Sequence, residues 1–240
     1  MTLKLLCDAF EAMERADSSE ELRAEMQKFA AEMGFSYFAY ALTINVPSLR
    51  PQQYVITGFP RPWVERYLSS GYFKIDPTVR HAEKSSLPTI WSDPALHDRN
   101  SDQFWDEAGM FGLVAGLSFA VHEQPGVTGI FSLARDGALD MRSSDLAALI
   151  GRAQMFASLL HHAVTRIHLA RLLPEQNTAL TAREQECLKW AADGKTAWEI
   201  GQILSIAERT AVFHVNNVIQ KLGATNKIQA IVRAVALKLV

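Results

Sequence analysis

A pair of aromatic residues and one acid give the N-terminal half of the chain groups that can bind a small polar molecule. Trp63 and Tyr67 are four residues apart, so on a helix they share one face. The indole N–H of Trp63 only donates hydrogen bonds, whereas an ionised carboxylate such as that of Asp76 only accepts them. These groups suit a ligand with both a carbonyl group and an N–H group. Each also has a structural interpretation, because aromatic residues at helical spacing often pack in a core and Asp before Pro77 often forms a turn.

The other residues capable of chemistry form no catalytic arrangement. His161 and His162 are adjacent on a predicted helix and point to different faces, which does not suit a pair of metal ligands. We find no Ser-His-Asp or Cys-His signature, and we interpret Cys187 as a small core residue. We therefore expect a binding protein rather than an enzyme, with no catalytic residue, no metal site and no cofactor.

The composition is that of an ordinary soluble globular protein. Of the 240 residues, 48% are hydrophobic and 21% are charged, which is enough apolar material to bury a core. Cys7 and Cys187 lie far apart and form no disulfide framework, and no apolar run approaches the ~18 residues of a membrane span. The N-terminus has no feature of a signal peptide. We therefore expect a cytoplasmic protein with no membrane partner.

The charge is distributed unevenly along the chain. From Glu175 to the C-terminus, 8 Lys and Arg residues outnumber 6 Asp and Glu residues, whereas acidic residues predominate in the rest of the chain. A mildly basic C-terminal segment favours binding of nucleic acid by that segment.

Residues 1–170 mix helical and strand patterns, and we predict that they form one domain. Ser18 and Glu21 form a capping box before an apolar-periodic stretch that Gly34 ends, which indicates a helix. The turn at 124–126 separates two apolar runs and indicates a β-hairpin. The predicted strands are 37–46, 54–57, 116–122 and 127–134, and the other predicted helices are 62–70, 101–110 and 143–172. This order is typical of an α+β fold, here an α-β-α sandwich similar to PAS and GAF domains, which can enclose an apolar cavity.

A short polar segment, residues 171–177, indicates a linker to a second domain, 178–240, which is made only of short helices. Three helix starts carry a capping pattern, in which a polar side chain satisfies backbone N–H groups that have no partner within the helix. The patterns are Thr181 with Glu184, Thr196 with Glu199, and Asn226 with Gln229.

The stretch from Ile206 to Gly223 predicts an amphipathic helix, with one apolar face and one polar face at helical spacing. A tight turn at 205–207 separates it from the short helix before it, which is the pattern of a helix-turn-helix. The second helix would enter the major groove, where Asn216 and Gln220 can pair with adenine. The alternative is a small helical bundle that binds other proteins.

The C-terminal segment resembles the DNA-binding domain of LuxR-type regulators. The matching motifs are Leu180-Thr181-Ala182-Arg183-Glu184, Ala192-Asp193-Gly194-Lys195-Thr196, Glu199-Ile200, Leu204-Ser205-Ile206, Thr210, His214, Asn217, Lys221-Leu222 and Asn226-Lys227. The resemblance implies an all-α, four-helix domain that binds double-stranded DNA through Lys195, Thr196, Arg209, Thr210, Val212, Phe213, Asn216, Asn217, Lys221 and Lys227. Two positions depart from the family, which usually has Ser at Ala207 and Val at Ala211. Loss of a Ser cap costs ~0.5–2 kcal/mol, which we expect the domain to tolerate.

The N-terminal domain resembles the autoinducer-binding domain of quorum-sensing LuxR-type regulators. The matching motifs are Phe59-Pro60-Arg61-Pro62-Trp63-Val64-Glu65-Arg66-Tyr67, Asp76-Pro77-Thr78-Val79, Trp91-Ser92 and Phe111-Gly112-Leu113-Val114-Ala115-Gly116. Ligands of that family are N-acyl homoserine lactones. The resemblance implies that the ligand is bound by Phe59, Trp63, Tyr67, Asp76, Thr78, Val79, Trp91, Phe104, Leu113 and Ser132.

The resemblance also implies a role for each polar group. Trp63 would donate to the lactone carbonyl, Asp76 would accept from the amide N–H, and Ser132 would donate to the acyl carbonyl. Many relatives have Tyr where this chain has Phe59, so Ser132 would bind the acyl carbonyl alone. We expect the acyl tail to be enclosed by Ile56, Val79, Leu113 and Leu117.

The resemblance implies a quorum-sensing transcriptional regulator. We expect an N-acyl homoserine lactone to shift the protein toward a homodimer that binds promoter DNA, with the helix 143–172 as the dimer surface. RNA polymerase is a candidate further partner. The alternative is a ligand-independent regulator, or an antagonist that forms mixed dimers with other proteins.

Overall fold

A computed structural model describes residues 3–45, 51–98, 101–139, 143–169, 180–236 and 239. The chain divides into two compact units. The first is formed by Met1–Thr43, Gln53–His122 and Thr128–Ala170, and the second by Arg171–Val240 with the strand-end segments Ile44–Gln52 and Glu123–Val127. The predicted linker, 171–177, lies outside the described residues.

A five-stranded antiparallel sheet forms the centre of the first unit. The strands are β1 (Tyr37–Ile44), β2 (Gln52–Thr57), β3 (Thr89–Ile90), β4 (Ala115–Gln124) and β5 (Val127–Arg135), and they lie in the order β2-β1-β5-β4-β3. β3 pairs with β4, with Thr89 opposite Ser118. The predicted hairpin of β4 and β5 is confirmed, and Gly126 in its turn has a φ of 76°, which favours glycine.

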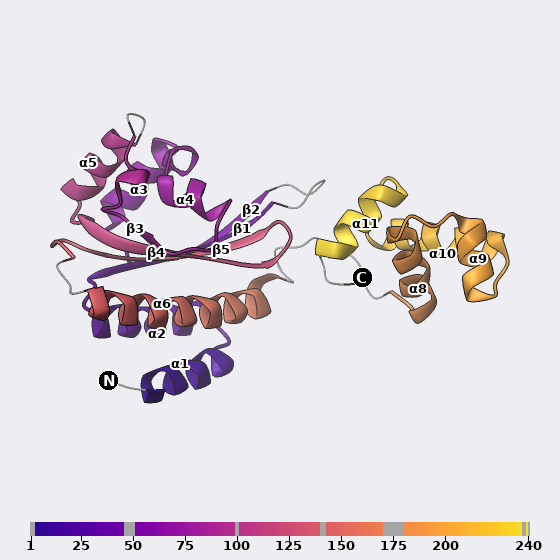
Figure 1. Cartoon of the computed structure of the whole chain (residues 1–240), viewed down its shortest axis with the longest axis horizontal. Helices are drawn as coiled ribbons and strands as arrows, with labels where there is room; N and C mark the ends of the chain where they lie inside the picture. The colour runs from indigo at the N-terminus through magenta and orange to yellow at the C-terminus, as the bar shows by residue number, and fades with distance from the viewer. Residues whose placement is uncertain are drawn as a thin grey trace. The chain divides into compact units, whose positions relative to one another are not determined.

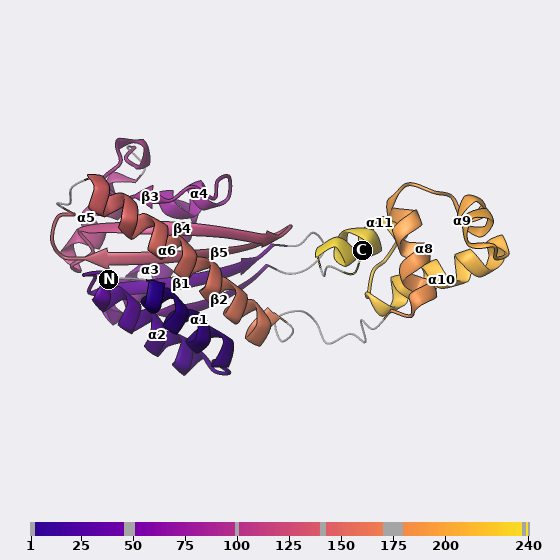
Figure 2. The same ribbon diagram turned by 60° about the horizontal axis from the view of Figure 1, so that its bottom comes forward.

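Three helices lie on one side of this sheet (Figures 1 and 2). They are α1 (Leu3–Arg15), α2 (Ser19–Glu32) and α6 (Ser143–Val164). The side chain of Ser18 caps α2 and accepts a hydrogen bond from Glu21 N, as the sequence predicts. Phe131 of β5 packs against Phe29 of α2 and Phe156 of α6, and the last two rings stack with centroids 3.9 Å apart. Large apolar side chains therefore make the core on this face.

Three shorter helices lie on the opposite face of the sheet (Figure 1). They are α3 (Arg61–Ser69), α4 (Pro77–Ala82) and α5 (Asp102–Met110), with the 3-10 turns η1 (Tyr72–Lys74) and η2 (Pro94–Leu96) between them. Pro62 lies in the first turn of α3, where its missing N–H leaves no bond unmade. Two helical layers with a sheet between them confirm the predicted α-β-α sandwich.

The prediction of one helix over 143–172 is only partly correct. The α-helix ends at Val164 and is followed by a π-helical turn, η3 (Thr165–Leu169), while residues 170–172 lie outside the described residues. Arg166 in this turn donates hydrogen bonds to the carbonyl oxygens of Met13, Glu14 and Ala16. Carbonyl groups at a helix end have no partner within the helix, so Arg166 both satisfies them and fixes the end of α1 against α6.

The second unit consists of α8 (Ala182–Ala192), α9 (Ala197–Leu204), α10 (Glu208–Lys221) and α11 (Lys227–Ala236). The predicted caps Thr181, Thr196 and Asn226 each accept a hydrogen bond from the backbone N–H three residues further on. Ala207, at the start of α10, makes no side-chain cap. The apolar stripe of α10 is buried against the other three helices, which confirms the predicted all-α domain.

Candidate functional site

An aromatic layer fills the space between the sheet and α3–α5. Its buried members are Trp63, Tyr72, Trp91, Phe104, Ala108, Leu113 and Ala134, and its partly buried members are Tyr37, Phe59, Tyr67, Ile75, Trp105 and Phe111. The structure therefore brings together the predicted ligand-binding residues Phe59, Trp63, Tyr67, Trp91, Phe104 and Leu113.

Trp63 lies at the centre of this aromatic layer and is only 2% exposed. Its ring centroid lies between 5.7 and 5.9 Å from those of Tyr67, Tyr72, Phe104 and Phe111. Tilted and edge-on arrangements at such distances are favourable for aromatic rings. The layer therefore holds the indole in place from several sides.

Asp76 is the N-cap of α4 and is joined to the aromatic layer through Tyr67. Its Oδ1 accepts hydrogen bonds from the backbone N and the hydroxyl of Thr78 at 2.8 and 2.7 Å, and its Oδ2 accepts one from the Tyr67 hydroxyl at 2.9 Å. Burial raises the pKa of Asp76 above its usual range, although these hydrogen bonds act in the opposite direction. Burial and the neighbouring Asp76 raise the pKa of Tyr67, so its hydroxyl stays protonated and donates.

A chain of hydrogen bonds links Trp91 to the sheet. Its Nε1 donates to Ser118 Oγ at 2.9 Å, and Ser118 Oγ lies 2.8 Å from Ser132 Oγ. Gly116 makes room for the indole, because a Cβ at this position would lie 2.5 Å from Leu133 O and 2.6 Å from the Trp91 ring. The sequence analysis named Ser132 but missed Ser118. Strand alternation puts Ser118 on the same face as Gly116, and this pattern could have identified Ser118 as a site residue from the sequence.

Several polar groups at this site have hydrogen-bonding capacity left over. Among the described residues Trp63 Nε1 has no partner, whereas Trp91 Nε1 donates to Ser118 and Trp105 Nε1 donates to Leu96 O. The two serine hydroxyls share one hydrogen in their mutual bond, so the pair retains a second hydrogen to donate. Asp76 Oδ2 accepts from Tyr67 and has a further lone-pair position. The Tyr72 hydroxyl in the same layer is also buried and has no hydrogen-bond partner among the described residues. The site therefore offers donors at Trp63, at Tyr72 and at the serine pair, and an acceptor at Asp76.

An ion pair joins the two helices that carry the central rings. Arg66 of α3 donates from Nε and Nη2 to the two carboxylate oxygens of Glu107 of α5, at 2.6 and 2.8 Å. Such two-point contacts fix orientation as well as distance. The hydrogen bonds from Arg66 are the main cause of the lowered pKa of Glu107, which is about 2. The pair therefore stays ionised at neutral pH and holds α3 against α5.

A second apolar cluster lies on the same face of the sheet. Val79 of α4 packs with Ala82, Ala120 and Ile130. Ala120 and Ile130 are each two residues away from Ser118 and Ser132 along their strands, so they share a face with the serine pair. This cluster continues the apolar surface away from the polar groups.

Two residues predicted to enclose an acyl tail lie on the other face. Leu117 precedes Ser118 on β4, so its side chain points to the side of α2 and α6. Ile56 shares a face with Tyr54, whose ring stacks on that of His168 in η3 with centroids 4.0 Å apart. The expectation that Ile56 and Leu117 line the ligand site is therefore wrong, because period-2 alternation places them in the other core.

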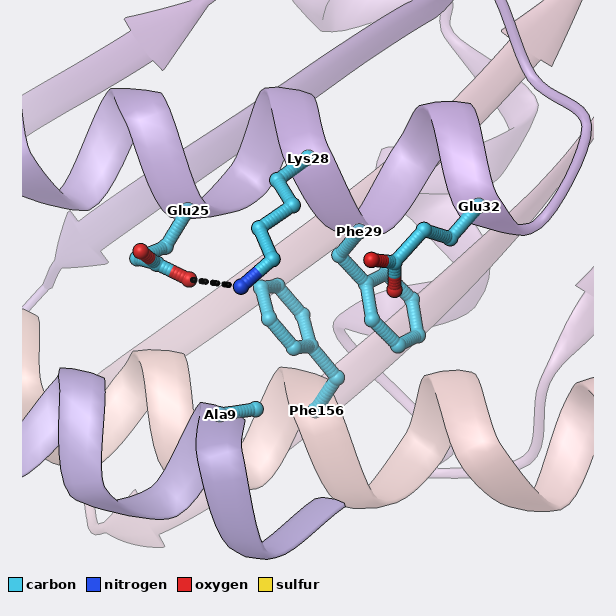
Figure 3. A pocket seen from close by; sticks show the side chains of 6 residues that line it. All are labelled: Ala9, Glu25, Lys28, Phe29, Glu32 and Phe156. Atoms are coloured by element: carbon cyan, nitrogen blue, oxygen red, sulfur yellow. Dashed lines mark ion pairs between the residues drawn. The ribbon is translucent and has the colours of Figure 1, made fainter. Parts of the chain in front are cut away.

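A small hollow lies among the helices on that other side of the sheet (Figure 3). It is lined by Ala9, Glu25, Lys28, Phe29, Glu32 and Phe156, and Lys28 pairs with Glu25 at 3.9 Å. Its volume of about 10 Å³ is near the minimum that holds a water molecule. It is too small for an organic ligand, and we assign it no function.

The second unit contains the helix-turn-helix that the sequence predicts. Ser205 ends α9 with a φ of 54°, the left-handed region in which other non-glycine residues of the described chain are not found. A Cβ on Gly201 would lie 2.8 Å from Ile206 O, so only glycine lets the turn pack this closely on α9. The turn therefore fixes the angle between α9 and α10.

The predicted DNA-binding residues lie mostly on exposed positions of this unit. On α10, Arg209, Thr210, Val212, Phe213 and Asn216 are exposed and Asn217 is half-buried. Lys195 and Thr196 stand before α9, and Lys227 begins α11 and is exposed. Lys221 instead donates to Glu184 Oε2 at 2.7 Å, which joins α10 to α8. Its predicted contact with DNA remains a prediction, and its bond to Glu184 gives it a role in packing.

Glu184 is a buried charge with several partners. Its Oε2 accepts hydrogen bonds from Thr181 N and from Lys221 Nζ. Burial alone would raise the pKa of Glu184, but the hydrogen bonds from Lys221 and Thr181 outweigh it and lower the pKa. Sequence reasoning identified Glu184 as a capping residue and missed Lys221, which lies 37 residues away in the chain.

Taken together, a sandwich domain with spare polar groups inside an aromatic layer and a helix-turn-helix domain define a ligand-responsive DNA-binding protein. Residues 18–164 match the family model of the autoinducer binding domain, and residues 178–234 match that of the bacterial regulatory proteins of the luxR family. The chain therefore belongs to the LuxR family of transcriptional regulators, with an autoinducer-binding domain and a DNA-binding domain, and it is not an enzyme.

Full-length relatives support this assignment. The chain is 38% identical to the transcriptional activator protein SolR of Ralstonia nicotianae, over 97% of this chain and 98% of SolR. It is 33% identical to the quorum-sensing regulator RhlR of Pseudomonas aeruginosa, over 95% and 93% of the two chains. The solved structure of SdiA in complex with octanoyl-rac-glycerol is 26% identical, with a TM-score of 0.80 over 97% of this chain and 94% of that one.

Within the described ranges, no helix is long and apolar enough to cross a membrane. Within the same ranges, no group of three or more His, Cys, Asp or Glu side chains is placed to hold a metal ion.

Proposed function

We propose that this protein binds an N-acyl homoserine lactone in the aromatic layer and, as a homodimer, binds promoter DNA through α10. The observation that carries the proposal is the indole of Trp63: the residue is only 2% exposed, and its N–H has no hydrogen-bond partner among the described residues. A ligand that accepts from this N–H adds a hydrogen bond worth about 0.5–1.5 kcal/mol net.

The polar groups of the site match those of the proposed ligand in kind. An N-acyl homoserine lactone has a lactone carbonyl, an amide N–H and an acyl carbonyl. Trp63 Nε1 would donate to the first, Asp76 would accept from the second, and the Ser118–Ser132 pair would donate to the third. A bond to the ionised carboxylate is the strongest of the three, because charge-assisted hydrogen bonds are about twice as strong as neutral ones.

The acyl tail would follow the apolar surface from the serine pair toward Val79 and Ile130. Ala82 and Ala120 are the small members of that cluster and leave the most room beside the tail. This path replaces the predicted one through Ile56 and Leu117. Longer chains would need to displace Val79 or Ile130, so affinity should pass through a maximum as the chain lengthens.

The DNA-binding part of the proposal rests on the exposed face of α10. Dimerisation places two such helices on a two-fold symmetric site, and we keep α6 as the proposed dimer surface. The relative SolR is a transcriptional activator, so contact with RNA polymerase belongs to the same proposal. We also keep 1–170 and 178–240 as the proposed domain boundaries, with 171–177 between them.

Thermal melting of the full-length protein tests ligand binding. N-octanoyl homoserine lactone at a hundredfold excess over its Kd should stabilise the protein by about 2.7 kcal/mol. Octanoylglycerol is the comparison compound, because it has the same chain length and lacks the amide N–H. We expect it to bind more weakly, and we expect the advantage of the lactone to disappear in Asp76→Asn.

Two outcomes would contradict the ligand proposal. In the first, acyl homoserine lactones of four to fourteen carbons all leave the melting temperature unchanged, while the protein is soluble and retards DNA without any of them. That result supports a ligand-independent regulator. In the second, octanoylglycerol stabilises the protein as strongly as the lactone and Asp76→Asn affects both equally, which assigns the site to another class of acyl compound.

A further inference from the structure

The recognition helix α10 presents an unusual pair of side chains on its exposed face. Val212 is 41% exposed and Phe213 is 60% exposed, whereas Ala211, Val215 and Val218 on the other face are buried. Single exposed apolar residues are common on protein surfaces and need no explanation. Two neighbouring ones in the middle of a proposed DNA-binding helix are different, because the exposed side chains there face either the DNA or water.

Apart from exposed Arg209 at the start of the helix, the surrounding residues restrict what this face can recognise. From Thr210 to Gln220 the helix has no Asp, Glu, Lys or Arg. Guanine is usually read by the paired donors of Arg or by Lys, and adenine by the amide of Asn or Gln. The polar side chains exposed on this stretch include Asn216 and Gln220, which suit adenine. Apolar side chains discriminate at one point of the major groove, the C5-methyl group of thymine.

We propose that Val212 and Phe213 read thymine methyl groups, so that the DNA half-site of this protein contains A·T pairs at the centre of the α10 contact. The inference deepens the proposed function and depends on α10 entering the major groove. Val212 and Phe213 lie four and three residues before Asn216, so they share a helix face with it. At ~1.5 Å per residue the separation is roughly 4.5–6 Å, or about one to two base pairs. Thymine and adenine contacts would therefore fall in neighbouring pairs.

The test begins by finding the DNA sequence that the protein binds. Full-length protein prepared with N-octanoyl homoserine lactone is used to select duplexes from a random 20-base-pair library. We expect the enriched half-site to contain A·T pairs at its centre. Each thymine of the enriched duplex is then replaced by deoxyuridine, which removes the methyl group and preserves the hydrogen bonds of the pair.

At one or two positions per half-site, deoxyuridine should weaken binding about fourfold, the effect of exposing one methyl-sized apolar group. Phe213→Ala should bind the thymine duplex more weakly than the parent protein does. The variant should bind the thymine and deoxyuridine duplexes about equally, so the ratio of their affinities falls to about one. Val235→Ala is the matched control, because Val235 is 38% exposed on α11, close to the 41% of Val212. It should keep the fourfold difference. All three side chains are exposed, and unchanged melting temperatures confirm that the variants are folded.

The outcomes separate this inference from the proposed function. If no sequence is enriched, with or without the lactone, sequence-specific DNA binding itself fails and the inference fails with it. If a sequence is enriched but deoxyuridine has no effect at any position, DNA binding stands and methyl recognition is overturned. The same holds if Phe213→Ala and Val212→Ala both retain the full difference between thymine and deoxyuridine.

Discussion

The two faces of the β-sheet are made by the same alternating strands, yet they bury different kinds of side chain. On the side of α2 and α6, Phe29, Phe131 and Phe156 pack into a core, with two of the rings stacked 3.9 Å apart. On the side of α3–α5, the rings of the aromatic layer meet at tilted and edge angles and enclose Trp63, Asp76 and the serine pair. One face stabilises the fold, and the other holds polar groups whose hydrogen bonds are incomplete.

The polar groups on the α2 and α6 side show that polarity alone does not make a binding site. Tyr40 Oη lies 2.7 Å from His161 Nδ1, and both residues are buried. Gly129 permits this approach, because a Cβ there would lie 2.3 Å from His161 Nδ1. This pair is a structural contact between β1 and α6. A site for a ligand needs groups that the chain itself leaves unsatisfied.

The largest expected effect comes from the apolar face. Phe156→Ala should reduce the free energy of unfolding by about 3–5 kcal/mol, because it removes a ring that touches Phe29 and Phe131 and leaves a cavity. Urea denaturation measures the loss. The ligand affinity of the protein that remains folded should be nearly unchanged. A small loss of stability together with a large loss of affinity would contradict the assignment of stability to this face and of ligand binding to the other.

Asp76→Asn should have the opposite effects, a large loss of ligand affinity and little loss of stability. It should weaken binding of N-octanoyl homoserine lactone by about 1.5–3 kcal/mol, roughly ten- to a hundredfold, because the ligand loses a bond to an ionised carboxylate. The fold should be preserved, since Asn caps a helix about as well as Asp. Titration calorimetry measures the affinity.

Asp93→Asn is the matched control for this variant. Asp93 caps η2 by accepting from Ala95 N at 2.9 Å, as Asp76 caps α4, but it is exposed. Its substitution should leave the affinity for the lactone unchanged. If Asp93→Asn and Asp76→Asn weaken binding equally, the loss reflects helix capping and not contact with the ligand.

A smaller effect is expected at the serine pair. Ser118→Ala and Ser132→Ala should each weaken lactone binding by about 0.5–1.5 kcal/mol, the net value of a neutral hydrogen bond. The double variant should lose less than the sum of the two, because the hydroxyls act as one donor unit through their 2.8 Å contact. Additive losses in the calorimeter would show that the two serines bind separately.

The smallest effect is the pH dependence of stability that Asp76 produces. Its pKa is raised in the folded protein, so its contribution to stability is complete below the pKa of the unfolded chain, about 3.9, and is lost as pH rises through the folded pKa. Asn does not titrate, so Asp76→Asn removes this loss of stability at higher pH. The stability of the variant relative to the parent protein should therefore increase from pH 4 to pH 8, as measured by urea denaturation. A constant difference across this range would mean that Asp76 is not desolvated.

Local features of the chain were predictable from the sequence, because their partners are a few residues away. The caps at Ser18, Thr181, Thr196 and Asn226 depend on groups three residues further on, and each is present in the structure. The amphipathic pattern of α10 separated its buried face from its exposed face for the same reason. The fold class followed from the order of such elements.

Features that depend on distant partners were not predictable in this way. Ser118 belongs to the candidate site because it bonds Trp91, 27 residues before it, and Ser132, 14 residues after it. Lys221 is held by Glu184 across 37 residues. The π-helical turn at 165–169 is accompanied by the contacts of Arg166 with the end of α1, a helix that the sequence analysis did not predict. The faces of Ile56 and Leu117 were predicted wrongly, because they depend on strand pairing, which the sequence alone does not show.

The most direct test of the account is the indole N–H signal of Trp63 in a spectrum of the protein labelled with ¹⁵N at its five tryptophans. Trp63→Phe identifies the signal, and Trp190 and Trp198 in the second unit serve as internal references. The account predicts that N-octanoyl homoserine lactone moves the Trp63 signal downfield as the free N–H gains an acceptor, with smaller changes at Trp91 and Trp105, whose N–H groups are already bonded. If the lactone binds and the Trp63 signal stays in place, the central claim is contradicted.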